Sequence, residues 1–247
     1  MRMIERRYGW LPDVPDSRDF LYKAIRPRLR LPPAVDLRFG CSPVEDQGKL
    51  GSCTAQALAG NIEYLDYAAD QMYADVSRLF IYYNERVLHK TAAVDSGAML
   101  RDGIQTLAKQ GVCHEEIWPY AVDKFADKPT AACYRQALQH KIVSYHRLSS
   151  LDDMFACLAD GFPFVFGMAV YESFASPAVA RTGTALMPKK TERLLGGHAV
   201  MAVGYDQKAK RFLVRNSWGA AWGREGYFTI PFEYLETLAR DFWTIRK

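Results

Sequence analysis

Apolar residues in the first half of the chain recur at steps of three and four. After Cys53 they include Leu58, Ile62 and Leu65, which is the spacing of one face of a helix. Ser52 stands just before this run as a candidate N-cap. The same spacing predicts further helices over residues 77–90 and 96–111, and from Ser150 to a stop at Gly161.

The last third of the chain has a different pattern. Short runs rich in β-branched and aromatic residues alternate with glycine or charged turns, and they predict strands at residues 163–171, 198–206, 211–216, 225–230 and 241–245. A helical half followed by a strand half favours an α+β fold in two layers or lobes. We place the helical lobe at about 45–140 and the β lobe at about 141–247.

Residues 1–33 form a distinct leader. They contain Pro12, Pro15, Pro27, Pro32 and Pro33, and prolines at this density disfavour regular secondary structure. The leader also carries large apolar side chains that need a surface to bury against. We therefore predict that it docks in an extended form on a domain spanning 34–247. A simple N-terminal strap on the back of one lobe is the alternative.

Composition excludes several classes of protein. The net charge of +4 is spread along the chain without long basic runs, so nucleic-acid binding is not indicated. No apolar run approaches the ~20 residues of a membrane span, and no signal-peptide pattern is present. The five cysteines are an odd number and far too few for a disulfide scaffold, which favours a reducing compartment. The pattern does not decide between the cytoplasm and export.

Cys53 is the first candidate for chemistry. It follows the glycine-rich segment QGKLGS and opens a predicted helix. The unpaired N–H groups and partial positive charge of a helix start stabilise a thiolate. A buried, inert thiol is the competing interpretation, and it describes most free cysteines.

His198 and Asn216 supply what a thiol nucleophile needs. His198 follows two glycines at the start of a predicted strand, and Asn216 ends a later strand just before Trp218. Each alone is more often an ordinary turn residue. Together with Cys53 they provide a nucleophile, a base and a group to orient the base. Their order matches the papain-type arrangement, in which His and Asn lie far downstream of Cys.

Three segments resemble the signature blocks of the papain family of cysteine proteases: QGKLGSC, GGHAVMAVGY and RNSWGAAWGREGYF. WPY at 118–120 and DSGAMLRDGI at 95–104 resemble two further family blocks. The resemblance extends over about residues 34–247. It implies a papain-like fold with a helical left lobe, a β-barrel-like right lobe and a cleft between them.

The resemblance also implies roles for individual residues. Cys53 would be the nucleophile, His198 its base, Asn216 the orienting residue and Gln47 an oxyanion donor. Gly97, Gly197 and Trp218 would contribute to substrate binding. The implied activity is peptide-bond hydrolysis through a thiolate–imidazolium pair and an acyl-enzyme. Papain-like enzymes are commonly made with a prosegment lying through the cleft, so residues 1–33 are expected to inhibit.

The chain departs from the family pattern in places. Leu50 and Thr54 replace the Cys and Trp that usually flank the nucleophile, and the first change removes a common disulfide. The short leader resembles that of bacterial members. Cys113 and Cys133 could pair or could be core thiols, and a Cys/His zinc site is the least favoured option because no C-x-x-C is present.

We expect a monomer that acts on peptide or protein substrates, with no cofactor, no metal and no nucleic-acid partner. Two other functions stay open from sequence. One is acyl transfer to an amine on the same three residues, as in amide ligation or transglutamination. The other is a catalytically silent binding module, against which the presence of Cys53, His198, Asn216 and Gln47 together argues.

Overall fold

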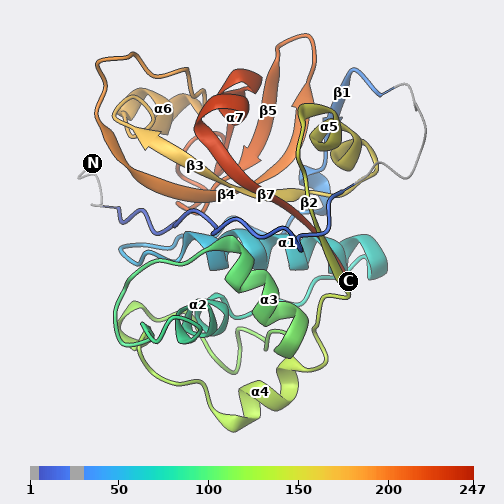
Figure 1. The fold of residues 1–247 in the computed structure, drawn as a ribbon, viewed down its shortest axis with the longest axis vertical. Coiled ribbons are helices and arrows are strands. Elements are labelled where there is room, and N and C mark those ends of the chain that lie inside the picture. The colour runs from blue at the N-terminus through green and yellow to red at the C-terminus, as the bar shows by residue number, and fades with distance from the viewer. Residues whose placement is uncertain (1–5, 23–30) are drawn as a thin grey trace.

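The structure is a computed structural model that describes residues 6–22 and 31–247. Helices and strands separate into two layers (Figure 1). The first layer holds four helices: α1 (Cys53–Asp70), α2 (Arg78–Val87), α3 (Leu100–Gln110) and α4 (Ala131–Ala137). Short 3-10 turns at Arg38–Gly40 and Val122–Lys124 belong to its connections.

The second layer is an antiparallel sheet with three short helices. Its strands are β1 (Ala34–Asp36), β2 (Ser144–Arg147), β3 (Phe164–Tyr171), β4 (Leu194–Asp206), β5 (Arg211–Arg215), β6 (Tyr227–Pro231) and β7 (Ala239–Arg246). The accompanying helices are α5 (Leu151–Ala159), α6 (Pro177–Thr182) and α7 (Phe232–Leu238). The strand order is β2-β7-β3-β4-β5-β6, with β1 paired to the far end of β4.

The fold is α+β as predicted, with one correction to the right lobe that the resemblance implied. No ladder joins the edge strands β2 and β6 across the part of the chain that is described, so the sheet is open and does not close as a barrel. The long strand β4 lies at its centre and also contacts α1. The site is therefore built where the first helix meets the central strand.

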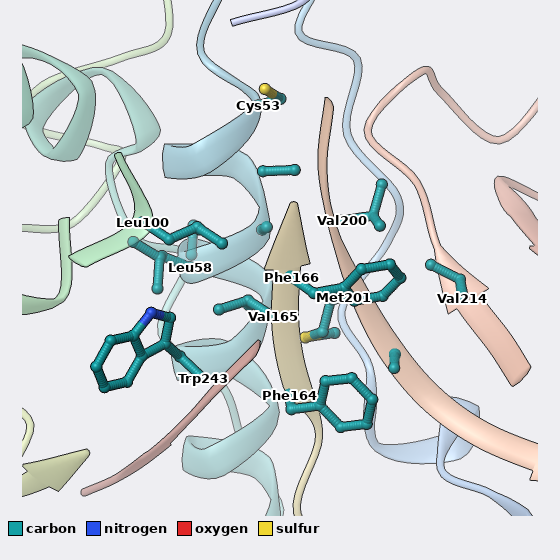
Figure 2. Packing of buried hydrophobic residues seen from close by; sticks show 14 of the residues in the cluster. Cys53, Leu58, Leu100, Phe164, Val165, Phe166, Val200, Met201, Val214 and Trp243 are labelled. Carbon is teal, nitrogen blue, oxygen red and sulfur yellow. The ribbon is translucent and has the colours of Figure 1, made fainter. Parts of the chain in front are cut away.

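A continuous core joins the two layers. Leu58 of α1 and Leu100 of α3 approach Val165 and Trp243 of the sheet, and Cys53 lies at the end of α1 above them (Figure 2). All of these side chains are buried. Because α1 is buried over most of its length, its first residue is held rigidly against the sheet.

The long helices and strands that the sequence predicted are present in the structure. Short elements such as α4, α6 and β2 were not predicted. Ser52 occupies the N-cap position of α1 as predicted, but its side chain does not cap the helix. Its hydroxyl instead lies 2.6 Å from the Tyr120 hydroxyl. All five cysteines are free thiols, so Cys113 and Cys133 are buried core residues and do not form a disulfide. No helix among the described residues could cross a membrane.

The N-terminal segment runs between the two layers (Figure 1, dark blue). Residues 6–11, called the covering segment below, contact both the helical layer and the sheet. Residues 13–22, called the strap, continue along β7 and β2. The part of the leader at residues 1–5 and 23–30 lies outside the described residues, and the division of the chain at residue 33 stays a prediction.

Candidate active site

Cys53 is the first residue of α1 and is fully buried. The backbone groups of Ala199, Gly9 and Thr54 lie close enough to its sulfur to lower the pKa of the thiol. Thr54 belongs to the first turn of the helix, and Ala199 directly follows His198 on β4. The helix start and the central strand thus bring the predicted nucleophile and base together.

Asn216 is hydrogen-bonded to the His198 ring. The Oδ1 atom of Asn216 lies 2.8 Å from His198 Nε2 and also accepts a hydrogen bond of 2.9 Å from the Ser217 backbone N–H. Because that N–H requires an acceptor, the atom facing the imidazole is the amide oxygen, and Nε2 carries the proton. In a neutral ring, Nδ1 then keeps its lone pair. Nδ1 is buried and has no hydrogen-bond partner, so it can accept a proton from a thiol.

Trp218 covers one face of the His198 ring. Its ring stacks on His198 at a centroid distance of 4.8 Å and an interplanar angle of 26°. Trp218 is itself buried against Phe174 and Trp222. Shielding from water strengthens the hydrogen bond between His198 and Asn216.

Gln47 is buried between the segment that leads into α1 and the residues that follow β5. Its Nε2 donates to the Leu50 carbonyl at 2.9 Å and to the Arg7 carbonyl of the covering segment at 3.4 Å. Its Oε1 accepts a 2.6 Å hydrogen bond from the Ser217 hydroxyl. Sequence reasoning missed Ser217, although it stands between Asn216 and Trp218 in a motif already singled out. Its hydroxyl fixes which way the Gln47 amide points.

The covering segment runs past Gly97 and Gly197, the two glycines that were predicted to bind substrate. Trp10 N donates to the Gly197 carbonyl at 3.0 Å, and Ala98 N donates to the Gly9 carbonyl at 2.8 Å. A Cβ at Gly97 would lie 2.1 Å from Gly9 O, so a side chain there would block the segment. Gly97 and Gly197 therefore both line the groove that residues 6–11 fill.

Side chains anchor the covering segment at its outer end. Arg6 pairs with Asp46 at 2.5 Å, and its guanidinium lies 5.2 Å from the centre of the Trp218 ring. Arg7 pairs with Asp95 at 2.8 Å. Each pair has a partly exposed member, so it contributes little on its own. Together the two pairs fix the register of the segment over the site.

The strap is held by buried polar groups. Asp13 accepts hydrogen bonds from Arg101 N on α3 and from Trp243 Nε1 on β7, and its own N–H donates to Asp241 Oδ2 at 2.8 Å. Burial and the neighbouring Asp241 raise the pKa of Asp13 to about 6. At the end of the strap, Tyr22 N donates to the Arg147 carbonyl of β2 at 2.7 Å.

Burial controls the protonation of the two reacting groups in this covered state. It raises the pKa of the Cys53 thiol to about 11, against the three backbone groups that lower it. It lowers the pKa of His198 to about 4, against the hydrogen bond to Asn216. The covered site therefore favours a neutral thiol and a neutral imidazole. The thiolate–imidazolium pair expected from the helix start is not the favoured state here, because desolvation outweighs the helix terminus.

The described residues contain no cluster of three or more His, Cys, Asp or Glu side chains suited to a metal ion. The chemistry available to the site is that of a thiol, an imidazole, two side-chain amides and backbone N–H groups. This set suits nucleophilic attack on a carbonyl and stabilisation of the resulting oxyanion.

Comparison with known proteins agrees with this geometry. Residues 31–236 match the model of the papain family cysteine proteases. Xylellain, a cysteine protease from Xylella fastidiosa, has a similar structure, with a TM-score of 0.89 and 43% identity over 97% of this chain and 96% of that chain. Procathepsin L2 of Tenebrio molitor shares the fold, with a TM-score of 0.72 and 23% identity over 93% of this chain and 74% of that chain.

A viral relative also aligns along nearly the whole chain. An uncharacterized peptidase C1-like protein of Acanthamoeba polyphaga mimivirus is 40% identical over 273 residues, which cover 99% of this chain and 88% of the relative. The family match covers most of the chain and includes the segments that carry Cys53, His198 and Asn216. The chain belongs to the papain family of cysteine proteases.

Proposed function

We propose that this protein is an endopeptidase that uses Cys53 as nucleophile and His198 as general base and acid. Asn216 orients the imidazole, and Gln47 donates to the oxyanion. The observation that carries the proposal is the free Nδ1 of a buried His198, held by Asn216 through Nε2, beside a cysteine at a helix start.

The mechanism follows from the positions of these groups. When substrate or water replaces the covering segment, the desolvation that keeps the pair neutral is reduced, and the N–H groups at the sulfur then favour the thiolate. The sulfur attacks the peptide carbonyl and forms a bond to carbon. The carbonyl oxygen becomes negative and accepts hydrogen bonds from Gln47 Nε2 and the Cys53 N–H. His198 protonates the leaving amine and then activates the water that releases the acyl group.

We further propose that the covering segment inhibits the enzyme. Residues 6–11 bury both Cys53 and His198, and they use backbone hydrogen bonds to Gly197 and Ala98 that a substrate would need. Tyr8 packs edge-on against His198, with ring centroids 6.5 Å apart. A substrate cannot reach the sulfur while these contacts persist. The strap then keeps the segment attached to the enzyme.

The orientation of the segment explains why it can resist cleavage. A backbone group that lowers the pKa of a nearby thiol does so by donating to the thiolate, so the group that the segment presents to the Cys53 sulfur is the Gly9 N–H. The Gly9 carbonyl points away and accepts from Ala98 N. An N–H group stabilises a thiolate but cannot be attacked by it, so the segment occupies the site without offering its peptide bond in a reactive geometry.

The test is hydrolysis of a fluorogenic peptide by the full chain, together with labelling by a thiol-directed epoxide. Cys53→Ala should abolish both signals, because the near-isosteric change removes only the nucleophile. Cys41→Ala is the matched control and should keep most of the activity. Activity in Cys53→Ala equal to that of the parent would refute the assignment.

Product analysis separates hydrolysis from the other functions that the sequence leaves open. Adding an amine should leave the free acid as the main product if water is the acceptor. Conversion of most product to the amide would identify acyl transfer instead. No turnover and no labelling of Cys53, even in a variant that uncovers the site, would identify a silent binding module.

A further inference from the structure

A buried carboxyl is hydrogen-bonded to the residue that follows the nucleophile. Glu85 of α2 is fully buried, and its Oε2 accepts a hydrogen bond of 2.8 Å from the Thr54 hydroxyl. Thr54 follows Cys53 in the first turn of α1. Its backbone is one of the three groups that lower the pKa of the Cys53 thiol. Glu85 therefore contacts the turn that presents the sulfur.

The other oxygen of Glu85 lies between apolar groups. Oε1 is buried and has no hydrogen-bond partner in the described part of the chain. A Cβ at Gly103 of α3 would lie 2.4 Å from this oxygen and 2.4 Å from Leu58 Cδ1, and both distances are far shorter than real contacts. The absence of a side chain at Gly103 therefore makes room for the carboxyl.

The charged groups around Glu85 do not neutralise it as an ion. The neighbouring Arg86 donates its guanidinium hydrogens to backbone carbonyls. Asp102 of α3 lies 2.7 Å from His89 Nε2 and brings a second carboxyl close to Glu85. Burial, with a smaller contribution from Asp102, raises the pKa of Glu85 well above its ordinary value, against the Thr54 hydroxyl and Arg86. The neutral form avoids an unpaired buried charge, which would cost far more than one unpartnered oxygen.

The charge of Glu85 matters to the nucleophile. An ionised Glu85 would raise the pKa of the Cys53 thiol and so oppose the thiolate. We propose that Glu85 is a positioning residue for Cys53: it acts as a neutral carboxyl that fixes the first turn of α1 through Thr54 and places no negative charge near the sulfur. The proposal rests on the peptidase function proposed above. It also gives a role to Thr54, which departs from the family pattern beside the nucleophile.

Two substitutions of Glu85 separate its hydrogen bond from its bulk. Glu85→Leu removes the acceptor at similar size and should lower kcat by about tenfold, the equivalent of one hydrogen bond. KM should change little, because the cleft residues are untouched. Glu85→Gln keeps an uncharged acceptor and should restore most of kcat. The measurement is steady-state hydrolysis of a fluorogenic peptide by the full chain.

A double-mutant cycle with Thr54→Val identifies the bond itself. If both side chains act through one hydrogen bond, the double variant loses no more kcat than either single variant. Thr106→Val is the control, because Thr106 is a buried residue of α3 whose hydroxyl donates to the Gly103 carbonyl at 2.8 Å. It should lower the melting temperature without changing kcat. If Glu85→Leu does not fold, Thr54→Val and Glu85→Gln still decide the outcome.

The pH dependence of alkylation tests the neutral state. The rate at which iodoacetamide labels Cys53 should have the same midpoint pH in the parent and in Glu85→Gln, because both carry an uncharged group. If Glu85 were ionised, Glu85→Gln would remove a negative charge and move the midpoint to lower pH. Glu85 forms no hydrogen bond with residues 6–11, so covering should affect both proteins equally.

The outcomes distinguish this inference from the proposed function. Parental kcat in Thr54→Val, additive losses in the cycle, or a lower midpoint in Glu85→Gln would overturn the positioning role and leave the peptidase function intact. A parent chain that neither hydrolyses peptides nor reacts at Cys53 would contradict the peptidase function itself.

Discussion

Replacing Gly9 by Ala should uncover the active site. A Cβ at this position would lie 1.8 Å from Gly51 O and 2.7 Å from Gly51 Cα. Ordinary contacts of this kind begin near 3.4 Å. Both Gly51 atoms are backbone, in the segment that leads into α1, and cannot turn aside. The covering segment would have to move outward by about 1.5 Å, which is enough to break hydrogen bonds at its centre.

The expected magnitude follows from the bonds that would be lost. Gly9 O, Trp10 N and Leu11 N each take part in one backbone hydrogen bond to Ala98 or Gly197, of 2.8 to 3.0 Å. A net value of about 0.5–1.5 kcal/mol for each predicts that covering weakens by about 1.5–4.5 kcal/mol. Because about 1.4 kcal/mol is a factor of ten, the uncovered fraction should rise roughly 10- to 1,000-fold until the site is fully open.

The assay is kcat/KM of the full chain on a fluorogenic peptide, together with the rate of epoxide labelling of Cys53. Both should increase in Gly9→Ala by the same factor, since both require the uncovered site. Arg18→Ala is the control, because its side chain is 86% exposed on the strap and its loss should change neither rate. If Gly9→Ala melts at the same temperature as the parent and shows no increase in either rate, residues 6–11 do not limit access to Cys53.

Three further predictions concern the site and the strap. His198→Ala should lower kcat by about 10²–10⁴-fold because it removes proton transfer. Asn216→Ala should lower kcat less, because the proposed role of Asn216 is only to orient the ring. Steady-state kinetics of the two variants gives the comparison, and equal losses of kcat would contradict the prediction. Ser217→Ala should lower kcat up to about tenfold by freeing the Gln47 amide, and a change in KM alone would count against this role. Burial of Asp13 should lower the stability of the fold as the pH rises from 4 to 6, and Asp13→Asn should reduce that loss. Melting temperatures at pH 4.5 and pH 7 would measure it. If the difference between the two melting temperatures is the same in Asp13→Asn and in the parent, the strap does not bury a charged Asp13.

The central features of the site could be predicted from sequence because each lies in a local motif. A cysteine at a helix start, a His after two glycines at a strand and an Asn before Trp218 carry their signal within a few residues. The long helices and strands were predictable for the same reason. The short helix α4 and the strand β2 offered too few residues for a period to be recognised.

The features that were missed depend on contacts between distant parts of the chain. The hydrogen bond from Ser217 to Gln47 and the use of the Ser52 hydroxyl by Tyr120 exist only once the layers have packed. The neutral protonation states of Cys53 and His198 in the covered site could not be predicted from sequence, because the helix start is a local feature and burial by residues 6–11 is not. The sequence indicated that the leader docks, but it could not divide it into a covering segment and a strap.

Acid should act in opposite directions on these two parts of the leader. The pKa of His198 is lowered to about 4 by burial, so its contribution to covering is present above the ordinary value of 6.5 and is lost as the pH falls through 4. The pKa of Asp13 is raised to about 6, so its contribution to docking is present below 3.8 and is lost as the pH rises through 6. Between pH 6 and pH 4, acid therefore favours exposure of His198 while it favours continued burial of Asp13. We therefore expect acid to open the proposed site by movement of residues 6–11 about a strap that stays docked, and we expect a return to higher pH to bring the same segment back to the same groove.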